Sequence, residues 1–520
     1  MTLRTHGSGL RLDGILSHAA ASDPERTAII FGDLTRTYAQ VSDRARRFAT
    51  VLAGLGVVKG DRVALWAPNR PEFLEIIFGI PLLGAIAVPL DHWWEKKDAL
   101  AALGQMRPKV LVVAAALASH LAGSDAELEA SGIEHILSLD EASDSGHLSY
   151  ARRLADAEPL VQPVSVAEDD PALILFTSGS TGRSKGAVHT HRGLCTTAMV
   201  MGLELGLRDG ERTLHFLPLF SSCLEHLIPL TLVRGTHVIM PHFDARGAWE
   251  AIEAHGITHV DAVPTTLRRL IEHIPAKVPA SLRLISYASE PMPPQLITQL
   301  AGLLPDTEFV QFYGMIEQLC LTVQGPSRQI PKLGTVGRPM IGAELRILGE
   351  DGEPGSGDEP GEIIARSPTL FAGYWQDPNT TAQVMRDGWM RTGDIGRIDE
   401  DGFLVLSGRV KEVIKSGGVT VIPSEVEAAL LSHESVREAA VVGVPDDNWG
   451  EAVHAFVVLH LGAEMPEKEL LAFCRQQLAG YKTPKSVHFV GDLPRTGIGK
   501  IARREVRDQF LRAQTSEVAA

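Results

Sequence analysis

The sequence predicts an α/β fold, with a large N-terminal domain built from parallel sheets and a small C-terminal α+β domain. The prediction rests on three observations. A chain of 520 residues is too long for one hydrophobic core, so at least two domains are expected. Short apolar runs alternate with helical patterns early in the chain, as in parallel α/β sheets. Beyond residue 412 the spacing and composition change, which indicates a separate small unit.

The composition is typical of a globular protein with an acidic surface. Hydrophobic residues make up 44% of the chain and charged residues 22%. The net charge of −15 argues against nucleic acid or an anionic membrane as a partner, so any anionic ligand must be held by local cations. The longest apolar stretch, 76–90, contains Gly and Pro and is shorter than the roughly 20 residues of a membrane span. No membrane span is expected.

The cysteines and the N-terminus predict a cytoplasmic protein. Four cysteines lie far apart without metal or redox spacing, which indicates reduced residues in the core. The first residues have no apolar run behind their basic residue, so no signal peptide is expected. We also expect no internal repeat, no low-complexity tract and no carrier-protein domain.

The first elements follow from spacing and capping. Thr37 and Gln40 form a capping-box pattern, and apolar residues then recur at helical spacing up to Gly56, which predicts an amphipathic helix. Beyond it we expect a strand at 60–66, a helix at 68–77, a strand at 85–90 and a buried strand at 172–176.

The buried strand leads into residues 177–186, which read Thr-Ser-Gly-Ser-Thr-Gly-Arg-Ser-Lys-Gly. Glycines let backbone N–H groups approach an anion, hydroxyls add donors, and Lys185 adds a positive charge, so a phosphate-binding loop is predicted. It is not a Walker A loop, because Gly186 stands where a Ser or Thr would hold magnesium. The residues expected to contact phosphate are Thr177, Ser178, Gly179, Ser180, Thr181, Gly182 and Lys185.

This loop is similar to the signature loop of the adenylate-forming enzymes, which include acyl-CoA synthetases, peptide-synthetase adenylation domains and firefly luciferase. At least seven motifs of that family follow one another in order between residues 177 and 501. The resemblance implies an AMP-binding domain over 1–408, a hinge over 409–411 and a mobile C-terminal domain over 412–520. It also implies ATP, Mg²⁺ and coenzyme A as cofactors.

Residues 311–317, Gln-Phe-Tyr-Gly-Met-Ile-Glu, resemble the family pattern Tyr-Gly-x-Thr-Glu. The resemblance implies that Tyr313, beside Gly314, stacks on adenine and that Glu317 binds the magnesium of ATP. An aromatic face and a hard carboxylate ligand suit these roles. Ile316 replaces the threonine that contacts the α-phosphate in relatives, which leaves two alternatives: adenylation is impaired, or another hydroxyl, from Ser289 or Thr322, substitutes for the missing one.

Two more segments depart from the family pattern. Ser221 stands where a histidine is common, and His226 is either a substitute for that imidazole or a core residue. Ala288 and Ser289 replace two glycines in a turn that borders the adenine and acyl cleft of relatives. The resemblance therefore implies an acyl pocket lined by Ser221, Cys223, His226, Ala288 and Ile316, and nucleotide contacts from Ser289 and Glu290.

The resemblance continues to the end of the chain. It implies that Asp394 holds the ribose hydroxyls, and a carboxylate with two acceptor oxygens fits a vicinal diol. It places Arg409 at the ribose, Lys411 at the hinge, Gly417 and Gly418 at the coenzyme A tunnel, and the catalytic lysine at Lys500.

The implied reaction has two steps. A substrate carboxylate attacks the α-phosphorus of ATP and pyrophosphate leaves, while the loop with Lys185, the magnesium ion on Glu317, and Lys500 offset the growing negative charge. After rotation about Lys411, coenzyme A attacks the acyl-AMP. The predicted pocket has no obvious cation, which favours a bulky apolar acid of the fatty, aryl or terpenoid class.

Other functions stay open at this point. They are thioester formation from a supplied acyl-AMP without efficient adenylation, loading of a carrier protein in trans, a nucleotide-binding regulator without catalysis, and luciferase-like oxidation. A homodimer is also considered.

Overall fold

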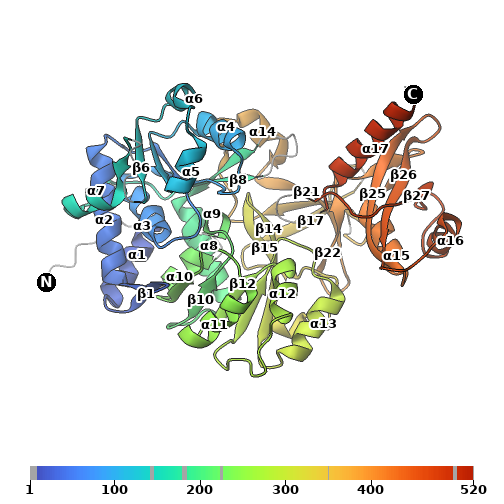
Figure 1. Cartoon of the computed structure of the whole chain (residues 1–520), viewed down its shortest axis with the longest axis horizontal. Helices are drawn as coiled ribbons and strands as arrows, with labels where there is room; N and C mark the ends of the chain where they lie inside the picture. Colours follow the sequence, from blue (N-terminus) through green and yellow to red (C-terminus); the bar gives the residue numbers. More distant parts are fainter. Residues whose placement is uncertain are drawn as a thin grey trace. The chain divides into compact units, whose positions relative to one another are not determined.

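The computed structural model describes residues 9–140, 146–177, 184–222, 226–349, 351–355, 357–495 and 501–518. The chain divides into two compact units (Figure 1). The first contains Met1–Leu345 and Ala365–Met390, and the second contains Arg346–Ile364 and Arg391–Ala520. The expected hinge at 409–411 lies within the second unit. The hinge and the domain boundaries drawn from the sequence stay predictions.

The first unit is built on two large sheets whose central strands are parallel, as predicted. The nine-stranded sheet has the order β16 (Arg338–Pro339), β15 (Gln318–Gln324), β14 (Glu308–Met315), β13 (Leu284–Tyr287), β12 (His259–Ala262), β10 (Arg212–His215), β11 (Thr236–Ile239), β1 (Thr27–Phe31) and β2 (Leu34–Thr37). The eight-stranded sheet has the order β19 (Gly373–Tyr374), β9 (Lys185–Thr190), β8 (Pro171–Thr177), β4 (Ile86–Pro89), β3 (Arg62–Trp66), β5 (Val110–Val113), β6 (His135–Ser138) and β7 (Leu148–Ser149).

Helices cover these sheets and close three cores. One face of the nine-stranded sheet packs against α11 (Ala245–His255), α12 (Pro264–Ile271) and α13 (Pro294–Leu303) (Figure 1). One face of the eight-stranded sheet packs against α4 (Lys96–Met106), α5 (Ala115–His120) and α6 (Asp125–Ala130). Its other face shares a core with α1 (Leu12–Ser22), α2 (Tyr38–Gly54), α3 (Glu72–Gly79), α7 (Tyr150–Asp156), α8 (His191–Glu204) and α10 (Ile228–Leu232).

The sequence patterns account for the early elements. The capping box of α2 is formed, because Gln40 N donates to Thr37 Oγ1 at 3.3 Å and Thr37 N donates to Gln40 Oε1 at 2.9 Å. The strands expected at 60–66, 85–90 and 172–176 are β3, β4 and β8. The helix expected from residue 68 begins only at Glu72, since Pro71 is its N-cap and disfavours helical backbone in the residue before it.

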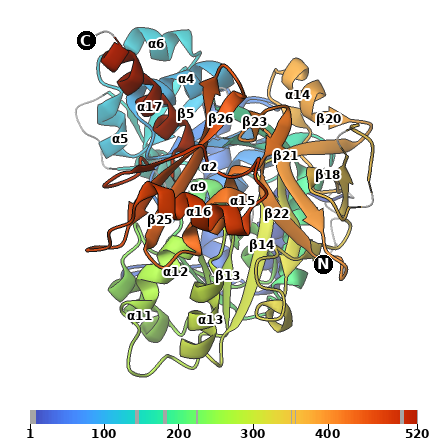
Figure 2. The same ribbon diagram turned by 90° about the vertical axis from the view of Figure 1, so that its right-hand side faces the viewer.

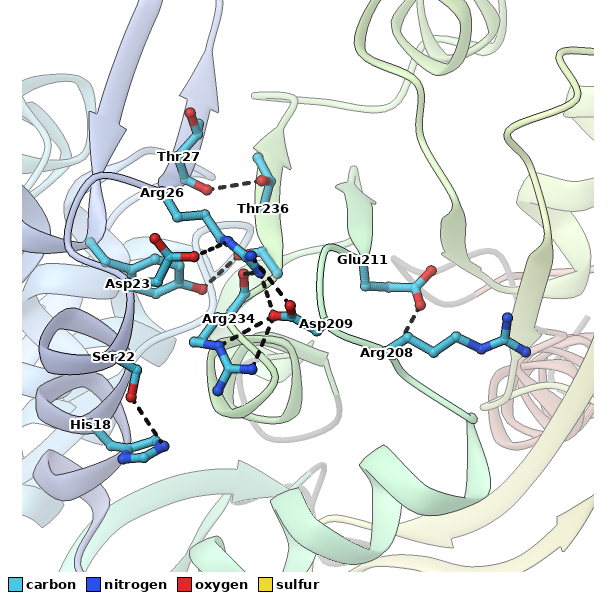
Figure 3. Close-up of polar contacts among 12 residues, drawn as sticks. His18, Ser22, Asp23, Arg26, Thr27, Arg208, Asp209, Glu211, Arg234 and Thr236 are labelled. Atoms are coloured by element: carbon cyan, nitrogen blue, oxygen red, sulfur yellow. Dashed lines mark hydrogen bonds and ion pairs between the residues drawn. The ribbon is translucent and has the colours of Figure 1, made fainter.

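A cluster of charges attaches the N-terminal segment to the nine-stranded sheet (Figure 3). The carboxylate of Asp209 accepts hydrogen bonds from Arg26 and from Arg234, whose Nη2 lies 3.0 Å from Oδ1. Nearby, Thr236 Oγ1 donates to the carbonyl oxygen of Thr27 at 2.9 Å, and β1 pairs in parallel with β11. Because Asp209 is 55% exposed, solvent weakens these ion pairs, and the backbone pairing carries most of the attachment.

The remaining strands form two five-stranded sheets. The first contains β17 (Glu344–Leu348), β18 (Gly361–Arg366), β21 (Trp389–Ile398), β20 (Met385–Arg386) and β22 (Leu404–Arg409), and α14 (Pro378–Val384) precedes β20. The second contains β24 (Val419–Val421), β23 (Ile414–Ser416), β26 (Gly450–Leu459), β25 (Val436–Asp446) and β27 (Ser486–Phe489). Helices α15 (Pro423–Leu431) and α16 (Glu467–Gln477) cover one face of that sheet and α17 (Arg503–Val518) covers the other (Figure 2). This is the α+β unit that the sequence predicts.

The described cysteines are core residues, as predicted. Cys195, Cys320 and Cys474 are buried free thiols, whereas Cys223 lies outside the described residues. Burial raises the pKa of Cys195 to about 12 and that of Cys474 to about 11, so both thiols stay protonated. Within the described ranges, no helix has both the length and the apolar character to cross a bilayer.

Candidate active site

The predicted phosphate loop closes a β-hairpin. Strands β8 and β9 pair in antiparallel register, with Thr177 opposite Lys185 and Phe176 opposite Gly186. The two ends of the loop therefore lie side by side, and Lys185 is the first residue of β9. The sequence predicted the strand before the loop but not the strand after it. The loop positions Ser178, Gly179, Ser180, Thr181 and Gly182 lie outside the described residues.

Close packing explains the glycine that follows Lys185. A Cβ atom at Gly186 would lie 2.7 Å from Ile174 Cγ2 and 2.9 Å from Met106 Cε. The free edge of β9 is covered by β19, in which Tyr374 pairs with Ala187. This packing fixes the position of β9 and therefore of Lys185 at its start.

Tyr374 connects the phosphate lysine with the predicted magnesium ligand. Its hydroxyl donates to Glu317 Oε1 at 2.5 Å, and Lys185 Nζ lies 5.2 Å from the centroid of its ring. Burial, with a further contribution from the negative charge of Glu317, raises the pKa of the phenol well above its ordinary value, so Tyr374 is a neutral donor. Sequence reasoning missed this residue; the available signal was a polar aromatic between Gly373 and Trp375.

The turn that carries Glu317 depends on a second close approach. Tyr313 and Gly314 lie at the end of β14, which forms a hairpin with β15, and Tyr313 is buried opposite Thr322. A Cβ atom at Gly314 would lie 2.3 Å from the carbonyl oxygen of Leu319. Only glycine fits between the two strands at this point.

Ile316 makes apolar contacts at the position where the resemblance implies a threonine hydroxyl. It is half-buried and belongs to a cluster with Phe371, Met315 and the ring of Tyr374. The proposed substitute Thr322 is not available, since its buried hydroxyl already donates to the carbonyl oxygen of Val336.

The turn after β13 contains Ser289, at a position where the resemblance implies a glycine, and Glu290, which has a hydrogen-bond partner in α12. Ser289 has φ +70°, the left-handed region that favours glycine. The carboxylate of Glu290 accepts from Thr265 N at 3.2 Å and from Thr265 Oγ1 at 2.8 Å, at the N-terminus of α12. Ala288 is partly buried against the core beside α8. Nucleotide contacts from Ser289 and Glu290 stay predictions.

Of the predicted acyl-pocket residues, His226 has the most informative surroundings. It is buried, and its Nε2 lies 2.9 Å from Oδ2 of Asp261 on β12. Asp261 Oδ1 accepts from Ser286 Oγ at 2.9 Å, and Ser286 Oγ lies 2.8 Å from His259 Nε2. Ser221, in the short helix α9 (Leu219–Ser222), donates to the carbonyl oxygen of Pro218 at 3.1 Å.

The same sheet face carries more buried histidines. His215 Nε2 lies 3.1 Å from His237 Nδ1, and His237 Nε2 lies 3.1 Å from Thr231 Oγ1. Burial lowers the pKa of His237 to about 3 and lowers those of His215 and His259 well below their ordinary value. These rings are neutral hydrogen-bonding groups near neutral pH.

In the second unit the two predicted ribose residues are neighbours. Asp394 on β21 is opposite Arg409 on β22, and Arg409 Nε lies 3.1 Å from Asp394 Oδ1. Lys411 follows in a turn in which Glu412 N donates to the carbonyl oxygen of Arg409 at 3.0 Å. The catalytic candidate Lys500 lies outside the described residues.

Gly417 and Gly418 form the two-residue turn between β23 and β24. Their φ angles are +60° and +81°, as a type I′ hairpin turn requires. Gly417 N donates to the carbonyl oxygen of Trp449 at 2.8 Å, and a Cβ atom at Gly417 would lie 2.9 Å from Cε3 of that indole. Trp449 is 42% exposed, and Lys485 Nζ lies 4.1 Å from its ring centroid. A partly exposed indole thus lies beside the predicted coenzyme A segment.

The described residues suit magnesium better than a metal held entirely by protein groups. They contain no group of three or more His, Cys, Asp or Glu side chains able to hold a metal ion. Mg²⁺ is commonly bound by one or two carboxylates together with substrate phosphates. Glu317 is such a carboxylate, and Tyr374 engages only one of its two oxygens.

Comparison with known proteins covers nearly the whole chain. The family model for AMP-binding enzymes matches residues 16–375, and the model for their C-terminal domain matches residues 425–500. A feruloyl-CoA synthase from Amycolatopsis sp. is 36% identical over 496 residues, 94% of this chain and 97% of that protein. A 2-succinylbenzoate–CoA ligase from Geobacillus kaustophilus is 36% identical over 503 residues, 95% and 96% of the two chains. The solved structure of a Mycobacterium tuberculosis fatty acyl CoA synthetase has a TM-score of 0.81 at 32% identity and covers 96% of this chain and 98% of its own.

Proposed function

Since the chain belongs to the AMP-binding enzyme family and is an AMP-forming acid–CoA ligase that uses ATP, Mg²⁺ and coenzyme A, we propose that it activates a bulky hydrophobic acid, fatty, aryl or terpenoid. One observation supports the first half-reaction: the predicted phosphate lysine Lys185 and the predicted magnesium ligand Glu317 contact the same tyrosine, Tyr374. Both groups that the first half-reaction needs are therefore held together.

In the first step the substrate carboxylate attacks the α-phosphorus of ATP, and pyrophosphate leaves. Lys185, at the base of the loop, offsets negative charge on the phosphates. Glu317 would hold Mg²⁺, which neutralises phosphate charge when bound. Tyr313 would offer its ring to adenine, and Lys500 is assigned to the developing charge.

In the second step the thiol of coenzyme A attacks the acyl carbonyl, and AMP leaves. We assign Lys411, in the turn after β22, to the rotation that exchanges the two half-reactions. The turn at Gly417 and Gly418 would then border the path of the thiol, with the indole of Trp449 beside it. Asp394 and Arg409 would hold the ribose of the adenylate.

The predicted acyl-pocket residues that the structure describes favour an apolar acid. Ser221, Ala288 and Ile316 carry no charge, and His226 already contacts a carboxylate. Ser221, Ala288 and Ile316 therefore offer no cation to a second carboxylate on the substrate. A monocarboxylic acid with an apolar body fits this set.

A panel of acids tests the substrate class. Fatty, aryl and terpenoid acids, each matched with a dicarboxylic acid of similar length, are incubated with ATP, Mg²⁺ and coenzyme A, and the acyl-CoA products are detected by mass. We expect turnover of hydrophobic monoacids and at least tenfold slower turnover of their diacids. Preference for the diacids would contradict the proposal. Replacing coenzyme A with a carrier protein tests whether the chain loads a carrier protein in trans. Binding of ATP without formation of any product would favour a nucleotide-binding regulator without catalysis.

A second candidate function is supported by Ile316 and Thr322. The hydroxyl expected at the α-phosphate is missing at Ile316, and Thr322, one of the two substitutes named from the sequence, already donates to the carbonyl oxygen of Val336. A donor aimed at transition-state charge can be worth about 10² to 10³ in rate, so the chain could act mainly on a supplied acyl-AMP. ATP–pyrophosphate exchange and thioester formation from synthetic acyl-AMP are compared in wild type and Ile316→Thr. Rapid exchange in wild type that threonine does not improve would exclude this function.

Neither the cytoplasmic location nor a homodimer is tested by the structure, and both stay predictions.

A further inference from the structure

We propose that Tyr374 is a positioning residue that keeps the magnesium ligand Glu317 and the phosphate lysine Lys185 apart and oriented before ATP binds. The inference rests on the proposed function and adds a residue to its site. Tyr374 uses different parts of its side chain for its two partners. The hydroxyl donates to Glu317 Oε1 at 2.5 Å, whereas the ring contacts Lys185 Nζ at 5.2 Å from its centroid.

Lys185 and Glu317 carry opposite charges and contact the same side chain, so they are natural partners for an ion pair. Within the described ranges no such pair is formed. A direct pair would occupy the cation that the phosphates need and the carboxylate that the metal needs. The phenol prevents this by offering the ammonium an aromatic face and the carboxylate a hydrogen bond.

The backbone fixes the tyrosine from two sides. Trp375 N donates to the carbonyl oxygen of Gly186 at 2.7 Å, which joins the segment to the strand that starts at Lys185. Phe371 N donates to the carbonyl oxygen of Glu317 at 2.9 Å, which joins it to the magnesium ligand. Tyr374 N donates to Thr381 Oγ1 at 2.9 Å. Residues 371–375 therefore connect the two halves of the phosphate site.

The hydrogen bond leaves the carboxylate usable. Tyr374 engages Oε1, and no described residue donates to Oε2. Glu317 can thus keep its orientation while its second oxygen serves a metal.

The test measures metal binding separately from turnover. Tyr374→Phe removes the hydroxyl and keeps the ring above Lys185. Binding of Mn²⁺ in the presence of ATP is followed by electron paramagnetic resonance, and binding of metal-free AMP by calorimetry. We expect Mn²⁺ affinity to fall about tenfold or more, since partners of metal ligands commonly contribute 10- to 100-fold, with little change in AMP affinity.

Tyr287→Phe is the matched control. Tyr287 is also a buried phenol of the first unit, and its hydroxyl donates to Gln311 Oε1 at 3.2 Å and to Gln329 Oε1 at 2.5 Å. Its loss should lower the melting temperature without changing Mn²⁺ affinity. A Tyr374→Phe variant that binds Mn²⁺ within twofold of wild type, or a Tyr287→Phe variant that loses as much affinity, would overturn the proposal.

A double-mutant cycle separates positioning from general damage. If Tyr374 acts through Glu317, Tyr374→Phe should have little further effect on Mn²⁺ binding in a Glu317→Gln background. An undiminished effect there would contradict the proposal. Binding of Mn²⁺ and ATP does not require the acid substrate. This test therefore stays valid even if the substrate class given under the proposed function is wrong.

Discussion

His226 Nε2 lies 2.9 Å from Oδ2 of Asp261, and both side chains are almost completely buried. The carboxylate has a second donor in Ser286, so its charge is compensated in the folded protein. Removing one partner of a buried pair leaves the other without compensation, which commonly costs about 3 to 5 kcal/mol. The pair therefore stabilises the region next to the predicted acyl pocket whatever the substrate is.

His226→Leu should lower the free energy of unfolding of the first unit by about 3 kcal/mol or more, because Asp261 loses a buried donor. Urea unfolding followed by tryptophan fluorescence measures the change. Ser221→Ala is the control: its hydroxyl is half-buried and bonds locally to Pro218, so a change below about 1 kcal/mol is expected. Equal effects of the two substitutions would show that the contact between His226 and Asp261 adds nothing to stability.

Stability should fall as the pH drops below about 6.5, the ordinary pKa of histidine. Burial lowers the pKa of His237 to about 3 and those of His189 and His191 to about 4. The unfolded chain therefore binds protons between about pH 6.5 and pH 4 that the folded chain cannot bind. The stability contribution is fully present above the unfolded pKa and is lost as the pH falls.

Melting temperatures at pH 7.5, 6.0 and 5.0 check this pH dependence. Each histidine that stays neutral in the folded protein lowers the free energy of unfolding by about 1.4 kcal/mol for every pH unit below 6.5. His237→Gln, which keeps a polar side chain, should make the decline shallower. A melting temperature that does not change between pH 7.5 and pH 5.0 would contradict the assignment of neutral buried rings.

Gly314→Ala should disable adenylation, because the added Cβ would lie 2.3 Å from the carbonyl oxygen of Leu319 and must displace the turn that carries Glu317. We expect ATP–pyrophosphate exchange to fall at least 100-fold and stability to fall by about 1 to 3 kcal/mol. Gly302→Ala, in α13 with open space around the new methyl group, should be neutral or slightly stabilising. Unchanged exchange in Gly314→Ala would show that the turn can move.

Gly417→Ala and Gly418→Ala form a matched pair for the thioester step. Both residues have positive φ, so each substitution strains the backbone, but only the methyl group at 417 would meet the indole of Trp449, at 2.9 Å. Gly417→Ala should raise the KM for coenzyme A several-fold more than Gly418→Ala does, with pyrophosphate exchange unchanged in both. Identical KM values for coenzyme A in the two variants would show that Trp449 does not border the path of coenzyme A.

Lys500→Ala should abolish acyl-AMP synthesis, because the lysine is assigned to charge that develops on the phosphates. Conversion of synthetic acyl-AMP to the thioester should continue at a rate near that of wild type. Both half-reactions are followed by mass detection of acyl-AMP and acyl-CoA. Equal loss of the two would contradict a role restricted to adenylation.

Local signals predicted much of this protein. The capping box at Thr37 and Gln40 and the strand before the phosphate loop are formed where the sequence pattern places them. Each depends on neighbours in the sequence. The strand β9 was missed because its register comes from pairing with β8 and β19.

Long-range contacts account for the rest. Tyr374 contacts Glu317 across 57 positions, and sequence patterns do not show which polar aromatic will reach which carboxylate. The partner of His226, Asp261, could more readily have been predicted from the sequence. Polar residues alternate with apolar ones at Thr213 and His215 and again at His259 and Asp261, which marks a buried polar sheet face. The left-handed Ser289 could not be read from a serine.

The order of synthesis matters for a chain whose compact units are interleaved. Residues 346–364 belong to the second unit, yet they leave the ribosome before residues 365–390, which belong to the first. The nascent first unit therefore has Lys185 and Glu317 before it has Tyr374. During that interval the two charged groups have no tyrosine between them, and the phosphate site can reach its final arrangement only after part of the following unit has been made.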